Sequence, residues 1–128
     1  MSNGPARLLI VGSGGHARSV ADAVLSEGVF ELAGFVSPQP IGQAVYAGYT
    51  VIGHDEDLED LYRSGIENAV VGIGFMGDNR VRSNVIRRLT AAGFCFPHIV
   101  DPTAVLARDV KLAEGVFVGK LAVVNAGA

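Results

Sequence analysis

A glycine-rich segment near the start of the chain is the part of the sequence best suited to hold a ligand. Gly12-Ser13-Gly14-Gly15-His16-Ala17 follows the apolar run Arg7–Val11 and precedes a helical pattern. Its Gly12-x-Gly14-x-x-Ala17 spacing is that of a dinucleotide-binding loop, in which glycines let the backbone approach a phosphate and the next helix supplies free N–H groups. We therefore predict a site for a phosphate-bearing ligand formed by Gly12, Ser13, Gly14, Gly15 and His16. The alternatives are a tight turn without a ligand and, for His16, a side chain that only caps the loop.

Residues at the ends of two later strands extend this predicted site. A dinucleotide site needs an acidic residue for the ribose at the end of the second strand, and this sequence has Ser37-Pro38 there, which argues against NAD. Because the carboxyl ends of parallel strands meet at one edge of a sheet, we expect Ser37, Pro38 and Gly74 to lie beside the glycine loop. Arg80 could reach the same edge and pair with a phosphate, whereas Arg82 is expected on a solvated helix face.

Alternating apolar runs and helical patterns predict the scaffold that positions these residues. The predicted strands are Arg7–Val11, Phe30–Val36, Tyr49–Gly53, Asn68–Gly74 and Phe94–Pro97. Helices are expected after the glycine loop, ending at Gly28, from His54 onward, and over Asp78–Ala92 with Val81, Val85, Ile86 and Leu89 facing the core. Two prolines and two glycines predict a loop over Ser37–Gly48. This order predicts an α/β Rossmann-like domain with a parallel sheet and right-handed crossovers over residues 1–98.

A repeat of six residues sets the end of the chain, residues 99–128, apart from this domain. Small or branched residues recur at Ala104, Val110, Val116, Ala122 and Ala128, and Leu106, Leu112, Val118 and Val124 follow two residues after the first four. Period-six repeats are typical of a β-helix, in which three units make one coil. The alternative is a pair of ordinary strands with glycine turns. Four units make little more than one coil, so we expect this sequence to be the front end of a longer protein.

Composition excludes several classes of function. The 128 residues include 10 basic and 13 acidic side chains with a net charge of −3, and no basic stripe points to nucleic acid or an anionic membrane. No apolar run approaches the roughly 18 residues that span a bilayer. The lone Cys95, expected to be a core thiol, fits a cytoplasmic protein without disulfides. Neither the cysteine nor the three histidines fall in a metal-binding pattern.

The ordered set of motifs resembles one family across the whole chain. That family is the bacterial sugar acetyltransferases, PglD-like and NeuD-like, that join a Rossmann-like nucleotide-sugar domain to a left-handed β-helix. The resemblance is carried by Gly12–Arg18, Ala33–Val36, Ile73-Gly74, Asp78-Asn79-Arg80-x-Arg82, Pro97-His98, Asp101–Ala104 and the six-residue repeats.

The resemblance implies a function and a set of partners. Gly14, Gly15, His16, Ser37, Pro38 and Gly74 would line a site for a UDP-sugar or related phosphosugar, although the family commonly has acids where this chain has Ser37-Pro38. Acetyl-CoA would donate the acetyl group, without a metal, between β-helices of a homotrimer. The general-base histidine of the family lies beyond residue 128, so no acetyl transfer is expected from these 128 residues alone. The alternatives are a stand-alone nucleotide-sugar binding or regulatory module and, less favoured, an NAD-dependent oxidoreductase.

Overall fold

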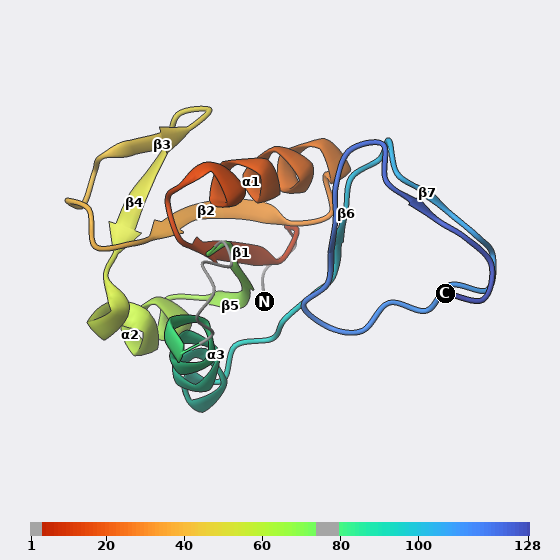
Figure 1. Ribbon diagram of the computed structural model, residues 1–128. Helices are drawn as coiled ribbons and strands as arrows, with labels where there is room; N and C mark the ends of the chain where they lie inside the picture. The colour runs from red at the N-terminus through yellow and green to blue at the C-terminus, as the bar shows by residue number, and fades with distance from the viewer. Residues whose placement is uncertain (1–3, 74–79) are drawn as a thin grey trace.

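The first part of the chain folds around a five-stranded sheet with the strand order β3-β4-β2-β1-β5 (Figure 1). The structure is a computed structural model that describes residues 4–73 and 80–128. The strands are β1 (Arg7–Val11), β2 (Glu31–Val36), β3 (Ala44–Tyr46), β4 (Tyr49–Gly53) and β5 (Ile66–Val71). Four of them run parallel, as the sequence predicts, and β3 is antiparallel to β4.

The antiparallel strand β3 corrects the expectation of a loop over Ser37–Gly48. Ala47 and Gly48 connect β3 to β4 with φ angles of 51° and 85°, the positive values that a tight hairpin turn needs. Three of the four residues that suggest a loop, Pro38, Pro40 and Gly42, precede β3, and the fourth, Gly48, lies in the turn after it, so the segment between them is free to pair. The sheet is therefore mixed at this edge.

The apolar run of β1 is buried on both sides, as predicted. Leu8 and Ile10 join the core under α1 (Gly15–Glu27), and Leu9 and Val11 join the core on the opposite face. That opposite face is covered by α2 (Leu58–Arg63), which follows the 3-10 turn η1 (Asp55–Asp57), and by α3 (Arg80–Ala92) (Figure 1). Gly28 ends α1 in the left-handed conformation, with φ 72°, as its predicted capping role requires.

Two expectations about apolar residues in this domain are wrong. On α3, Val85 and Leu89 are buried, whereas Val81 and Ile86 are exposed, because the side of α3 that faces α2 and β5 carries Val85 and Leu89. Cys95 is exposed and not a core thiol. It forms one isolated bridge with Asn68 at the open edge of β5, instead of the full strand predicted over Phe94–Pro97.

The end of the chain forms a coil of short parallel strands. β6 (Ile99–Val100) pairs with β8 (Phe117–Val118), and β7 (Val105–Leu106) pairs with β9 (Val123–Val124). Each strand therefore meets the one three repeat units further along, which a β-helix predicts and two ordinary strands do not. Val105 and Val123 are exposed, whereas the repeat positions on either side of them are half-buried: Ala104, Leu106, Ala122 and Val124.

The coil and the sheet domain share a core. Ile99 of β6 is fully buried in the same cluster as Val20, Val24 and Leu8. The division into 1–98 and 99–128, and the left-handed sense of the coil, stay predictions. No helix within residues 4–73 and 80–128 is both long and apolar enough to cross a membrane.

Candidate functional site

Backbone hydrogen bonds bring the ends of four strands together at one edge of the sheet. The Gly12 N–H donates to the Val36 carbonyl and the Gly72 N–H to the Val11 carbonyl, both at 2.8 Å. The Ser37 N–H donates to the Gly53 carbonyl at 3.3 Å. The glycine loop and Ser37-Pro38 therefore lie at the same edge, as the sequence predicts. Gly74 and the Asp78-Asn79 pair lie outside the described residues.

The glycines at this edge fall into two groups. A Cβ at Gly12, where φ is 118°, would lie 2.9 Å from the Gly72 carbonyl oxygen, and one at Gly72 would lie 2.9 Å from Ile10 Cγ2. These two glycines permit close packing of the chain on itself. Within residues 4–73 and 80–128, no atom other than those of the chain neighbours lies within 4 Å of a Cβ built at Gly14 or Gly15. Packing against the described residues does not require glycine at these two positions, and the space that a side chain would take there is open with respect to them.

The N-terminus of α1 lies directly under this open space. Gly14 is its N-cap and offers no side-chain hydrogen bond, and the first turn holds no acidic residue. The first N–H groups of a helix lack partners within the helix and carry partial positive charge. Arg18 folds back from the same turn, where its Nε lies 3.4 Å from the Gly14 carbonyl oxygen. Together these groups form an electropositive site that suits a phosphate.

Of the two arginines at the start of α3, Arg82 differs from expectation and Arg80 is not tested. Arg82 is predicted in solvent, but it is half-buried and its guanidinium donates to the Ile73 carbonyl at 3.3 Å. Arg80 is the exposed first residue of α3, and its reach to a phosphate stays a prediction.

At the end of β2, the site has a hydroxyl in place of an acid. Ser37 is buried, and its Oγ accepts a hydrogen bond from the Gln39 N–H at 3.1 Å. Pro38 is exposed at the same edge.

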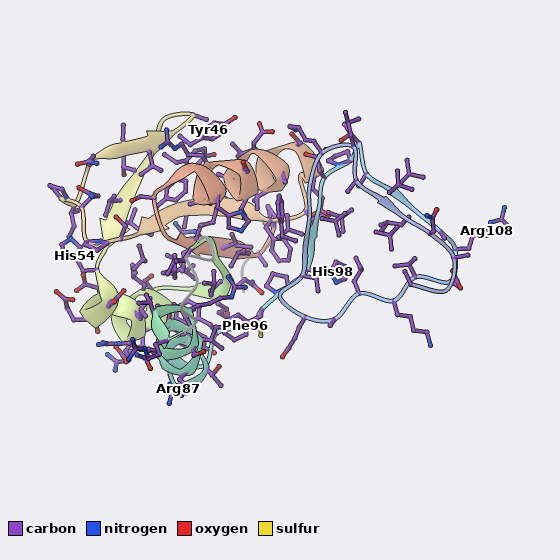
Figure 2. All side chains as sticks on the ribbon, in the orientation of Figure 1. Tyr46, His54, Arg87, Phe96, His98 and Arg108 are labelled. Atoms are coloured by element: carbon purple, nitrogen blue, oxygen red, sulfur yellow. The ribbon has the colours of Figure 1, made fainter. Side chains whose placement is uncertain are left out.

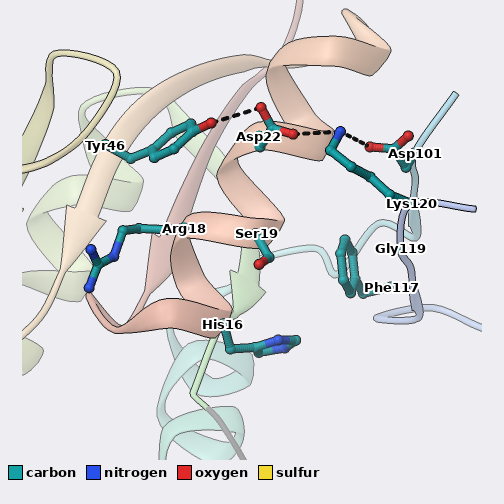
Figure 3. Close-up of a pocket in the computed structure, with 9 residues that line it drawn as sticks. All are labelled: His16, Arg18, Ser19, Asp22, Tyr46, Asp101, Phe117, Gly119 and Lys120. Atoms are coloured by element: carbon teal, nitrogen blue, oxygen red, sulfur yellow. Dashed lines mark hydrogen bonds and ion pairs between the residues drawn. The ribbon is translucent and has the colours of Figure 1, made fainter. Parts of the chain in front are cut away.

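A cavity of about 460 Å³ lies between α1 and the coil (Figure 3). It is lined by His16, Arg18, Ser19, Asp22, Tyr46, Asp101, Phe117, Gly119 and Lys120. The His16 ring meets Phe117 edge to face, with 5.6 Å between ring centroids, so it faces the coil as well as adjoining the glycine loop. His54 lies at the end of β4, and His98 lies directly before β6, where the chain enters the coil (Figure 2).

A chain of charged groups closes one wall of this cavity. Lys120 Nζ lies 2.6 Å from Asp22 Oδ2 and 2.9 Å from Asp101 Oδ2, and the Tyr46 hydroxyl donates to Asp22 Oδ1 at 2.8 Å (Figure 3). Asp101 also accepts bonds from the backbone N–H and hydroxyl of Thr103. The network joins β3, α1 and two turns of the coil.

Hydrogen bonds within this network shift the pKa values of its members. The Lys120 ammonium, and then Thr103, lower the pKa of Asp101 to about 2. Lys120 also lowers the pKa of Asp22, and the two carboxylates raise the pKa of Lys120. The hydrogen bond to Asp22 raises the pKa of Tyr46. Both carboxylates and the ammonium are therefore charged at neutral pH.

Sequence reasoning missed Asp22, Tyr46, Asp101 and Lys120 as a group. They come from segments far apart in the chain, and none falls at a spacing typical of a known site. The one local signal is the Asp101-Pro102-Thr103 turn, because an Asp side chain often bonds to the backbone two residues on.

The fold and the glycine loop together define a Rossmann-like domain joined to a coil of six-residue repeats. The family model of the PglD N-terminal domain matches residues 7–89. The chain belongs to this family, as its motifs predict.

Comparison with solved structures extends the match to the coil. PerB, the perosamine N-acetyltransferase of Caulobacter crescentus in complex with CoA and GDP-perosamine, is 32% identical, covers 98% of this chain and 56% of its own, and has a TM-score of 0.80. The acetyltransferase domain of PglB from Neisseria gonorrhoeae in complex with acetyl coenzyme A is 27% identical, covers 94% and 56%, and has a TM-score of 0.77. The chain thus spans a little over half the length of these proteins.

More distant comparisons add the fold alone. RSP, a Rex-family repressor solved in complex with β-NADH, is 21% identical, covers 91% of this chain and 53% of its own, and has a TM-score of 0.56. A comparison with curated protein sequences gives no match.

Proposed function

We propose that this chain binds a nucleotide-linked amino sugar and forms the substrate-binding part of an acetyl-CoA-dependent sugar N-acetyltransferase. Membership of the PglD N-terminal domain family and 32% identity to PerB, which was solved with GDP-perosamine and CoA, support this function. The observation that carries it is the N-terminus of α1, which has no side-chain cap at Gly14, with no described atom in the space that a side chain at Gly14 or Gly15 would take.

In this proposal, each part of the ligand meets a different part of the sheet edge. The diphosphate lies on the free N–H groups of α1, near Arg18. The nucleoside extends toward Ser37 and Pro38, where β2 ends. The sugar then lies on the side of His16, at the mouth of the cavity between α1 and the coil. Acetyl-CoA would supply the thioester carbonyl that the sugar amine attacks, with CoA thiolate as the leaving group. None of the three histidines is assigned as the base that takes the amine proton.

The identity of the nucleotide is part of the test. The sequence resemblance favours a UDP-sugar, and the ligand of PerB is a GDP-sugar. Titration calorimetry of the chain with a UDP-amino sugar, a GDP-amino sugar and NADH compares the three directly. We expect one sugar nucleotide to bind more tightly than NADH, because β2 ends without the acid that holds the ribose of a dinucleotide. Tight NADH binding without sugar-nucleotide binding would overturn the proposal.

Gly14→Val tests the phosphate contact. The valine places a branched side chain in the open space over α1, where the backbone has an ordinary φ of −88°. We expect a folded protein whose affinity for the sugar nucleotide falls at least ten-fold, because the phosphates lose their close approach to the N–H groups. Ser26→Val, at an exposed position near the other end of α1, is the matched control. Equal affinity in the two variants would remove the glycine loop from the site.

An acetyl-transfer assay distinguishes the alternative of a stand-alone binding or regulatory module. Such a module would bind the sugar nucleotide, but a longer protein that contains this chain would transfer no acetyl group from acetyl-CoA to it. The enzyme proposal expects transfer in that assay, detected as release of free CoA thiol.

A further inference from the structure

We propose that His54 is a positioning residue for the nucleoside end of the ligand, and this inference rests on the proposed function. His54 lies where β4 ends, beside the segment Ser37–Gln39 that follows β2 (Figure 2). That segment begins one residue after Val36, whose carbonyl accepts the hydrogen bond of Gly12. The segment is therefore tied to the first glycine of the phosphate loop, at the strand end where Rossmann-like domains receive a ribose.

The contact of His54 with this segment is short and has a defined direction. His54 Nε2 lies 2.8 Å from the backbone carbonyl oxygen of Gln39. A carbonyl oxygen only accepts hydrogen bonds, so the proton of the ring must reside on Nε2 in this contact. The ring thus donates across from the end of β4 to the loop that follows β2.

The backbone of His54 is itself held in place. Its N–H donates to Asp57 Oδ2 at 2.8 Å, and the Asp57 N–H donates to the His54 carbonyl at 2.9 Å. These bonds fix His54 as the N-cap residue, directly before η1. The imidazole therefore projects from a rigid base, with its side chain about one-third exposed at 32%.

The segment Ser37–Gln39 has weaker restraints of its own. The Ser37 N–H reaches the Gly53 carbonyl at 3.3 Å, and the Gln39 N–H bonds within the segment to Ser37 Oγ at 3.1 Å. Pro38 and Gln39 are exposed. The bond from His54 to the Gln39 carbonyl, at 2.8 Å, is shorter than the bond from Ser37 to the Gly53 carbonyl. Without it, a bound nucleoside would have to order the segment at a cost in affinity.

The test replaces His54 by Asn and by Gln. Asparagine is a favourable residue at a helix start, but it is too short to reach the Gln39 carbonyl. Glutamine carries an N–H donor at nearly the reach of the histidine Nε2. His98→Asn, at an exposed position outside the site, is the control. Calorimetry with GDP, UDP and inorganic pyrophosphate separates affinity for the nucleoside from affinity for the phosphates, and hydrogen exchange of the Gln39 amide reports the order of the segment.

We expect His54→Asn to weaken binding of the preferred nucleoside diphosphate about five-fold, the usual worth of one such hydrogen bond. Pyrophosphate affinity should stay unchanged, the Gln39 amide should exchange faster, and His54→Gln should restore affinity to within about two-fold. Unchanged nucleotide affinity in His54→Asn, or an equal loss for pyrophosphate, would overturn the inference. If the native chain binds no nucleotide, the proposed function fails as well. If the native chain binds the nucleotide and His54→Asn binds it as tightly as the His98→Asn control does, the inference alone fails.

Discussion

The Lys120 side chain forms ion pairs with two carboxylates that come from different parts of the fold. It bridges Asp22 of α1 and Asp101 of the coil, and the Asp101 side chain is 1% exposed. A buried carboxylate without a cation is strongly unfavourable, so removing one partner of such a pair costs more than the pair contributes. The position of the coil against α1 therefore depends on Lys120 keeping its charge.

Lys120→Met should lower the thermal midpoint at neutral pH more than Asp101→Asn does. The first change leaves the Asp101 carboxylate buried without its cation, whereas the second removes the charge that needs one. Lys111→Met, an exposed lysine on the same coil, is the matched control and should leave the midpoint unchanged. Thermal unfolding followed by circular dichroism measures all three. The reverse order of the two midpoints would show that the network does not hold the coil.

Acid should weaken the fold through Asp101. Its pKa falls from 3.8 to about 2 in the folded chain, so the carboxylate contributes stability that is complete above its unfolded pKa. That stability is lost as the pH falls from about 4 toward 2, because the folded chain must then take up a proton that the unfolded chain already holds. The thermal midpoint measured across this range should fall less steeply in Asp101→Asn than in the native chain. Parallel curves would contradict the assignment.

At the scale of elements, the packing of α1 on the sheet depends on the absence of a side chain at Gly72. The Cβ of an alanine there would lie 2.9 Å from Ile10 Cγ2 and 3.0 Å from Ala17 Cα. Ile10 belongs to the central strand β1, and Ala17 is fully buried in the first turn of α1. Gly72, directly after β5, thus allows β1 and α1 to pack closely on either side of the glycine loop that joins them.

Gly72→Ala should destabilise the protein by about 1–3 kcal/mol, the usual cost of excess volume in a packed core. Gly14→Val, at the same edge but in open space, should change stability by less than about 0.5 kcal/mol. Urea unfolding of the two variants gives the free energies. Stability equal to the native chain in Gly72→Ala would mean that β1 and α1 can separate without cost.

At the scale of the whole molecule, the coil and the sheet domain are joined by apolar packing, a hydrogen bond and an ion pair. Ile99 of β6 is buried against α1, Val100 donates its N–H to Glu27 Oε2 at 3.3 Å, and Lys120 joins the two parts by charge. Short parallel strands of this kind bury little surface by themselves. The sheet domain therefore covers the first coil and stabilises it.

Ile99→Ala should cost about 2–5 kcal/mol because it opens a cavity in this shared core. The loss should appear in the sheet domain as well as in the coil, as faster hydrogen exchange in both α1 and β6. Val105→Ala, on the exposed side of β7, is the control and should have a small effect. Faster exchange confined to the coil would show that the two parts fold independently.

The sequence by itself determined the parallel strands, the glycine loop, its neighbours at Ser37-Pro38 and the six-residue repeat. The strands, the loop and the repeat depend on residues close together in the chain, so their spacing predicts them before folding. The position of Ser37-Pro38 beside the loop follows from the rule that parallel strands end at one edge of a sheet. Tertiary structure alone decided the pairing of β3, the exposure of Val81 and Cys95, and the meeting of Asp22, Asp101 and Lys120. These features depend on which surfaces the folded chain leaves uncovered and on contacts between distant segments, and no local pattern encodes either.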